Sequence, residues 1–101
     1  MKAIVADRAF SLEEGNHFYE LDIDTPQPHD KELLVRVEAI SVNPVDTKIR
    51  QSPVQNGPRI LGYDCVGTIE AIGDNVTLFD IGDTVYYSGS QDCQGSNQEY
   101  Q

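Results

Sequence analysis

The stretch Val42-Asn43-Pro44-Val45-Asp46-Thr47-Lys48 decides the fold, together with the later segments Leu61-Gly62-Tyr63-Asp64 and Gly82-Asp83-Thr84-Val85. Asparagine is a frequent helix cap, so Asn43 can start a helix here. Pro44 suits the first helical position, because the N–H that proline lacks would have no intrahelical partner there. The first stretch therefore predicts a short helix that begins at Pro44.

The rest of the chain alternates between short strands and turns. We expect strands at 3–6, 18–23, 32–40, 65–72 and 84–87, with exposed loops at 25–28 and 51–59 and tight turns at 73–75 and 81–83. In segment 32–40, apolar and polar side chains alternate with the period of two that a strand with one buried face shows. The side chains expected on that buried face are Leu33, Val35, Val37 and Ala39. Many short strands separated by turns predict a mainly β barrel or sandwich.

The length of the chain allows one domain. At 101 residues it can form one hydrophobic core but not two. A dinucleotide-binding domain would require a glycine-rich turn between a strand and a helix, because the pyrophosphate binds at a helix N-terminus. The glycines are spread one per turn, and none opens an apolar helical run. We therefore expect no Rossmann domain in residues 1–101.

The charge balance excludes several classes of partner. There are 17 acidic and 7 basic residues, a formal net charge of −10. Such a chain repels phosphate backbones and anionic lipid, so we expect no nucleic-acid binding and no membrane binding. No apolar run approaches the ~20 residues that span a bilayer, and no secretory signal is present. The sequence therefore predicts a cytoplasmic protein, in which Cys65 and Cys93 are free thiols.

The three opening motifs occur in order with Gly67, Glu70, Gly73 and the final segment 95–100. This order and spacing resemble the N-terminal catalytic domain of the medium-chain dehydrogenase/reductase superfamily, the GroES-like domain. The resemblance covers essentially the whole chain. It implies a GroES-like, partly open β-barrel with short helical turns, in which residues 1–101 form the catalytic domain and the nucleotide-binding domain is missing.

Two positions distinguish the branches of that superfamily. In its zinc alcohol dehydrogenases, a cysteine stands where this chain has Asn43, and a Gly-His-Glu motif stands where it has Gly62-Tyr63-Asp64. An amide and a phenol are poor zinc ligands compared with a thiolate and an imidazole. The cysteine cluster of the structural zinc lobe is also absent. The closer resemblance is to the zinc-free quinone oxidoreductases, so we expect no metal.

The resemblance implies a hydride transfer from NADPH to a quinone or an α,β-unsaturated carbonyl. Negative charge then develops on the carbonyl oxygen and needs hydrogen-bond donors. The candidate catalytic residues are Asn43, Tyr63 and Thr47. Asn43 and Lys48 are the candidates for cofactor binding, and Tyr63 and Lys48 for substrate binding. The isolated chain should neither hold NADPH nor turn over, because the missing Rossmann domain makes most cofactor contacts.

A second interpretation places the chain in another class. The small co-chaperonin has the same fold and acts by binding, so the chain could be a free-standing GroES-like module. The co-chaperonin binds its partner through a long mobile loop with an apolar tripeptide, whereas the loop 51–59 here carries Val54 as its lone aliphatic residue. A glycine-rich strand–helix unit encoded in frame after Gln101 would exclude the binding module.

Further expectations concern neighbouring residues. We expect Asp46 to make a structural hydrogen bond, Asp64 to pair with Arg50 or Lys48, and both His17 and His29 to be exposed. Cys65 should be an inert core thiol, because reactive thiols need an electropositive, accessible setting. The segment 96–100 should form a strand that ends as a loose, unpaired tail beside an uncovered apolar face. Such a surface favours association into a homo-oligomer.

Overall fold

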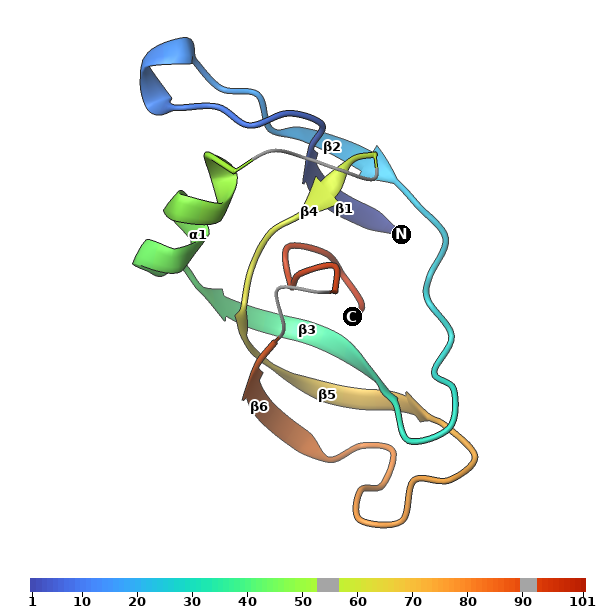
Figure 1. The fold of residues 1–101 in the computed structure, drawn as a ribbon. Helices are drawn as coiled ribbons and strands as arrows, with labels where there is room; N and C mark the ends of the chain where they lie inside the picture. Colours follow the sequence, from blue (N-terminus) through green and yellow to red (C-terminus); the bar gives the residue numbers. More distant parts are fainter. Residues whose placement is uncertain (53–56, 90–92) are drawn as a thin grey trace.

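Two antiparallel sheets of three strands each make up most of the computed structural model, which describes residues 1–52, 57–89 and 93–101. The first sheet has the order β2-β1-β4, with β1 at Lys2–Ala6, β2 at Tyr19–Asp22 and β4 at Arg59–Ile60. The second has the order β3-β5-β6, with β3 at Leu33–Ser41, β5 at Asp64–Ile72 and β6 at Thr84–Ser88. The helix α1, Pro44–Arg50, follows β3 directly, and a single 3-10 turn spans Leu12–Glu14. Figure 1 shows α1 at one side of the molecule, where the chain passes from β3 of the second sheet toward β4 of the first. The fold is mainly β, as expected, and the sheets do not close into a barrel within the described residues.

The first sheet contains a small apolar core. Antiparallel pairing places Val5 opposite Tyr19 of β2 on one side and opposite Ile60 of β4 on the other. Val5, Ile60 and Ala3 are buried together. The strands predicted at 3–6 and 18–23 are confirmed, and they pair with each other. The predicted loop 51–59 is wrong at its end, because Arg59 belongs to β4; positions 53–56 of that loop lie outside the described residues.

The second sheet departs from the expected alternation. The β3–β5 register shifts twice, between Leu34 and Val35 and between Val37 and Ala39. Leu34 and Val35 are consequently both buried, whereas Ala39 is exposed. A bulge inserts an extra residue into one strand and moves the following side chains to the other face. The predicted buried position of Ala39 is therefore wrong, although the strand itself is confirmed.

The C-terminal segment joins the two sheets instead of ending loose. The N–H of Ile4 in β1 donates to the carbonyl of Asn97 at 2.9 Å, and the N–H of Val37 in β3 donates to the carbonyl of Glu99 at 2.9 Å. Val35 and Gln101 exchange two backbone hydrogen bonds of 2.8 and 2.9 Å. Figure 1 shows this segment lying between the sheets. The expectation of an unpaired terminal strand is wrong, because the tail forms isolated bridges to both sheets.

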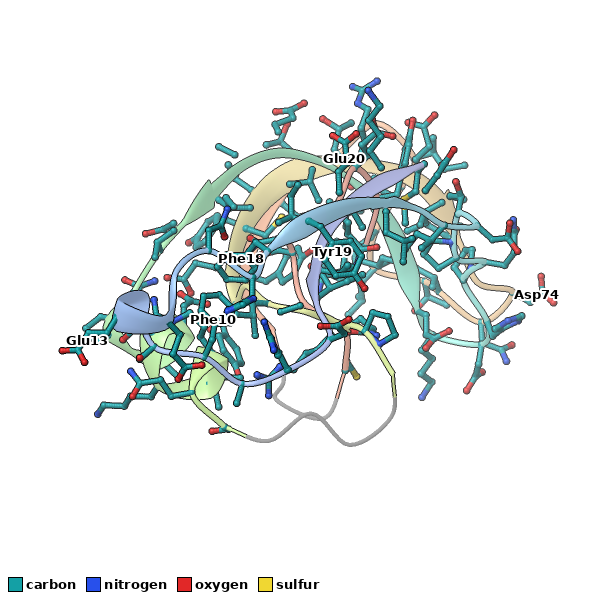
Figure 2. All side chains as sticks on the ribbon, turned by 90° about the horizontal axis from the view of Figure 1, so that it is seen from above. Phe10, Glu13, Phe18, Tyr19, Glu20 and Asp74 are labelled. Carbon is teal, nitrogen blue, oxygen red and sulfur yellow. The ribbon has the colours of Figure 1, made fainter. Side chains whose placement is uncertain are left out.

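The loop before β2 packs on α1 through aromatic rings. Phe10 is buried, and its ring meets the edge of Phe18 at 5.0 Å between centroids; Figure 2 shows the two side by side. His17 also meets Phe10 edge-on, at 5.2 Å, and contacts Arg8, so it is half-buried and not exposed as predicted. His29 is exposed and Cys65 is buried, as expected.

Several large apolar side chains remain exposed on the second sheet and its connecting loop. Leu78 and Tyr86 each keep 88% of their surface exposed, and Ile81 keeps 64%. Within the described part of the chain, no helix has the length and apolar character needed to cross a bilayer.

Candidate functional site

The start of α1 is held by a short local network. Asn43 precedes the helix in an extended conformation, and its backbone N–H donates to Asp46 Oδ2 at 2.8 Å. The N–H of Asp46 donates in turn to the Asn43 carbonyl at 3.0 Å. This carboxylate, three residues into the turn, satisfies a backbone donor that a helix start leaves free. The expected structural hydrogen bond of Asp46 is confirmed.

The Asn43 side chain hydrogen-bonds to two residues at one end of the second sheet. Its Nδ2 donates to Asp64 Oδ2 at 2.6 Å and to the Ser41 carbonyl at 3.4 Å. Ser41 and Asp64 are register partners at the ends of β3 and β5, which places residue 43 beside the carboxylate. The expected pairing of Asp64 with Arg50 or Lys48 is wrong: no ion pair joins these groups, all of which the structure describes.

Thr47 and Lys48 lie on the exposed side of α1. The Thr47 hydroxyl donates to the carbonyl of Pro44 at 2.7 Å, so its proton is used within the helix. The Lys48 side chain is exposed, and its ammonium makes no hydrogen bond or ion pair with any described residue. Lys48 is therefore available to an anionic group.

Tyr63 is half-buried between Gly62 and Asp64. Its backbone carbonyl accepts the N–H of Gly89 at 2.8 Å, which joins this segment to the end of β6. Its side chain interacts electrostatically with Arg59. Asn43 and Tyr63 are thus linked only through Asp64, which accepts a hydrogen bond from the first and follows the second in the chain.

Arg59 is a site neighbour that the sequence did not reveal. Its Nη2 donates to the carbonyls of Ile49 at 2.6 Å and Ser52 at 3.1 Å, at the C-terminal end of α1. Burial lowers the pKa of Arg59, and the interaction with Tyr63 opposes that shift. The only sequence signal was a cation four residues before Tyr63, in a segment predicted to be an exposed loop.

An open groove borders Asp64 on the second sheet. It has a volume of about 570 Å³ and contains Ile40, Val66 and Tyr86 as its large apolar side chains. Its position beside the Asn43–Asp64 pair makes it the apolar surface next to the candidate site.

The donor set does not suit a zinc ion. No group of three or more histidine, cysteine, aspartate or glutamate side chains gathers as a metal site in the described ranges. The Asn43 nitrogen donates to Asp64 and to the Ser41 carbonyl, and residue 63, directly before Asp64, carries a phenol. These groups do not form the three or four nitrogen and sulfur ligands that zinc takes in proteins.

Comparison with known proteins identifies the family. Residues 29–101 match the alcohol dehydrogenase GroES-like domain, and the chain belongs to this family. Over all 101 residues it is 57% identical to a zinc-type alcohol dehydrogenase-like protein of Staphylococcus epidermidis. The chain spans 30% of the length of that relative.

Solved structures agree with this assignment. A protein of Rhizobium etli CFN 42, assigned to the zinc-dependent alcohol dehydrogenases, superposes with a TM-score of 0.94 at 37% identity, over 100% of this chain and 30% of its own. The quinone oxidoreductase of Coxiella burnetii superposes with a TM-score of 0.86 at 31% identity, over 99% of this chain and 33% of its own. A mycobacterial protein in complex with NADPH superposes with a TM-score of 0.82 at 31% identity, over 99% of this chain and 30% of its own. The resemblance to the GroES-like domain of the medium-chain dehydrogenase/reductase superfamily is confirmed.

Proposed function

We propose that this chain is the catalytic domain of an NADPH-dependent oxidoreductase that reduces quinones or α,β-unsaturated carbonyls. The observation that carries the proposal is the Asn43–Asp64 hydrogen bond of 2.6 Å, with Tyr63 directly before Asp64 in the chain. The resemblance places the metal ligands of the zinc enzymes at residues 43 and 63, and an amide that donates to a carboxylate is a poor substitute for a thiolate ligand. The similarity to a quinone oxidoreductase and to an NADPH complex supports the choice of substrate and cofactor.

The chemistry assigns different tasks to the candidate residues. The reduced nicotinamide of NADPH supplies the hydride, and charge then develops on the substrate oxygen. Tyr63 can donate a hydrogen bond or a proton to that oxygen, and its side chain interacts electrostatically with Arg59. Asn43 and Thr47 would donate to substrate only after releasing their present acceptors, so we assign them to positioning. This revises the catalytic roles predicted for these two residues.

Lys48 is the candidate for contact with the cofactor. Its ammonium is exposed on α1 and unpaired within the described residues, and an ammonium on a flexible stem suits a phosphate. We propose that it binds a phosphate of NADPH in the complete protein. Lys48→Met should then raise the KM for NADPH and leave kcat nearly unchanged, whereas Lys31→Met, at another exposed lysine, should change neither.

Zinc content tests the metal part of the proposal. Curated relatives carry zinc in their names, but the amide and phenol described above do not suit the ion. Protein purified without a metal-affinity tag should contain far less than one zinc per chain by elemental analysis. A value near one zinc per chain would contradict the proposal.

Activity of a longer gene product tests the reaction. A protein in which this domain is joined to a nucleotide-binding domain should oxidise NADPH in the presence of quinones or enones. Tyr63→Phe should lower kcat about 10²-fold, the usual size of a lost proton donor. Tyr19→Phe is the matched control, because Tyr19 is exposed and lies on β2 of the first sheet, away from the groove. Equal activity of the two variants would exclude Tyr63 as the donor.

A further inference from the structure

We propose that Asp64 is a positioning residue, whose carboxylate holds the Asn43 amide and thereby fixes residues 43–48 relative to Tyr63. The inference deepens the proposed function and rests on it for the effect on turnover. The structural part, that one hydrogen bond sets the relative position of two segments, can be tested without any substrate.

Two hydrogen bonds form a continuous link from β5 to α1. Asp64 at the start of β5 accepts a hydrogen bond from Asn43 Nδ2 at 2.6 Å. The backbone N–H of Asn43 donates to Asp46 Oδ2 at 2.8 Å. Asp46 is only 8% exposed and lies within the first turn of α1. The Asn43–Asp64 hydrogen bond is charge-assisted and 2.6 Å long, so it is among the stronger hydrogen bonds in proteins.

The direction of the Asn43 amide follows from the chemistry of its partners. A carboxylate and a backbone carbonyl only accept hydrogen bonds, so the nitrogen of Asn43, and not its oxygen, must face Asp64 and Ser41. The two amide hydrogens are then both directed at these acceptors. Asn43 is thereby held in one orientation.

The link joins the two parts of the candidate site. Thr47 and Lys48 are carried by α1, whereas Tyr63 directly precedes Asp64. Hydride transfer requires reacting atoms to be held in close register, and a misplacement of about 1 Å can cost about 10²-fold in rate. Loss of the Asp64 carboxylate should therefore lower turnover through the displacement of Asn43 and α1.

The first experiment follows the Asn43 side chain in the 101-residue chain by ¹⁵N NMR, with its signals assigned by their disappearance in Asn43→Asp. In the unmodified chain, the hydrogen bond should shift the NMR signal of one Asn43 amide proton away from the chemical shift of a free amide. Asp64→Ala should restore the chemical shift of a free amide and increase backbone mobility in residues 43–48. Asp74→Ala is the matched control, since Asp74 is an exposed turn residue whose side chain projects from the surface in Figure 2.

The second experiment exchanges the two groups in a gene product that also carries a nucleotide-binding domain. Asn43→Asp alone places two carboxylates face to face and should lower kcat about 10-fold or more. The double substitution N43D/D64N restores one amide and one carboxylate with their positions exchanged, and should recover most of kcat. A double-mutant cycle of this kind isolates the interaction between the two side chains.

Each result bears on the proposal. Unchanged Asn43 signals and unchanged mobility of residues 43–48 in Asp64→Ala would overturn it. Recovery of the melting temperature without recovery of kcat in N43D/D64N would show that the amide at position 43 reacts directly, and would overturn the positioning role. If the unmodified enzyme reduces no quinone or enone with NADPH, the proposed function fails, and the NMR comparison alone decides the role of Asp64.

Discussion

Gly62 should be the least replaceable glycine beside the candidate site. Its φ is +110°, a backbone conformation that residues with a side chain rarely adopt. A Cβ at this position would lie 2.5 Å from Ser96 Oγ and 3.0 Å from the Ser96 nitrogen. Ser96 is 1% exposed and belongs to the segment that joins the two sheets, so it has little room to move.

Two costs add in Gly62→Ala. A side chain held at positive φ costs about 1 to 3 kcal/mol, and forcing a methyl group into a packed site costs about 1 to 3 kcal/mol more. The free energy of unfolding should therefore fall by about 2 to 6 kcal/mol. Because small domains have only about 5 to 15 kcal/mol in total, this variant should be severely destabilised.

Urea unfolding with two control variants separates the costs. Gly82→Ala has a similar φ of +96° but nothing within 4 Å of its Cβ, so it should show the backbone cost alone. Gly67→Ala has no positive φ, but its Cβ would overlap the backbone oxygen of Arg36, so it should show the steric cost alone. With a slope of about 2 kcal/mol per molar urea, each 2 kcal/mol lost lowers the midpoint by about 1 M.

A midpoint for Gly62→Ala equal to that of Gly82→Ala would refute the reasoning. It would mean that the tail moves away from residue 62 at no cost, and that Ser96 is not a fixed neighbour of the candidate site. A soluble but unfolded Gly62→Ala chain, with a folded Gly82→Ala chain, would agree with the predicted sum.

Three further predictions concern the ends of the sheets and the surface. Burial raises the pKa of Tyr87 well above its usual range, so the folded state favours the neutral phenol. The stability that this provides is complete below the pKa of tyrosine in the unfolded chain, about 10, and is lost as the pH rises above that value. In urea titrations, the free energy of unfolding should therefore fall less between neutral and strongly alkaline pH for Tyr87→Phe than for the unmodified chain. An equal fall in both would exclude the Tyr87 phenol as the cause of the alkaline destabilisation. Arg59→Lys should lower the free energy of unfolding by about 1 to 2 kcal/mol, because lysine lacks the guanidinium Nη2 that donates to the Ile49 and Ser52 carbonyls at the end of α1; no change in the urea midpoint would show that those contacts add nothing. The chain should self-associate more strongly in high salt, which screens the charge of −10, and Leu78→Asp should weaken this because that side chain is 88% exposed; a strict monomer in sedimentation at high protein and salt concentration would contradict the prediction.

The sequence alone determined the features that depend on neighbouring residues. The helix at Pro44 was predictable because a cap, a proline and a short apolar pattern act within one turn. Strands β1, β2, β3, β5 and β6 were predictable because apolar side chains recur every second residue or run together between turn residues. The turn at Gly82, with its φ of +96°, was predictable for the same local reason. These signals, in their order, were also sufficient to indicate the family.

Only the tertiary structure decided the features that join distant segments. The two register shifts in β3 depend on how that strand meets β5, so the alternation in its own sequence misplaced Ala39. The tail binds β1 and β3 through groups that lie more than 60 residues away in the chain, so its local sequence could not show that it would be held. Asp64 was assigned to the cations of α1, yet the Ser41–Asp64 register places it against Asn43. The polar groups of a side chain bind the partner that the fold places nearest. Strand register and packing decide which partner that is, and the residue types along the chain do not show it.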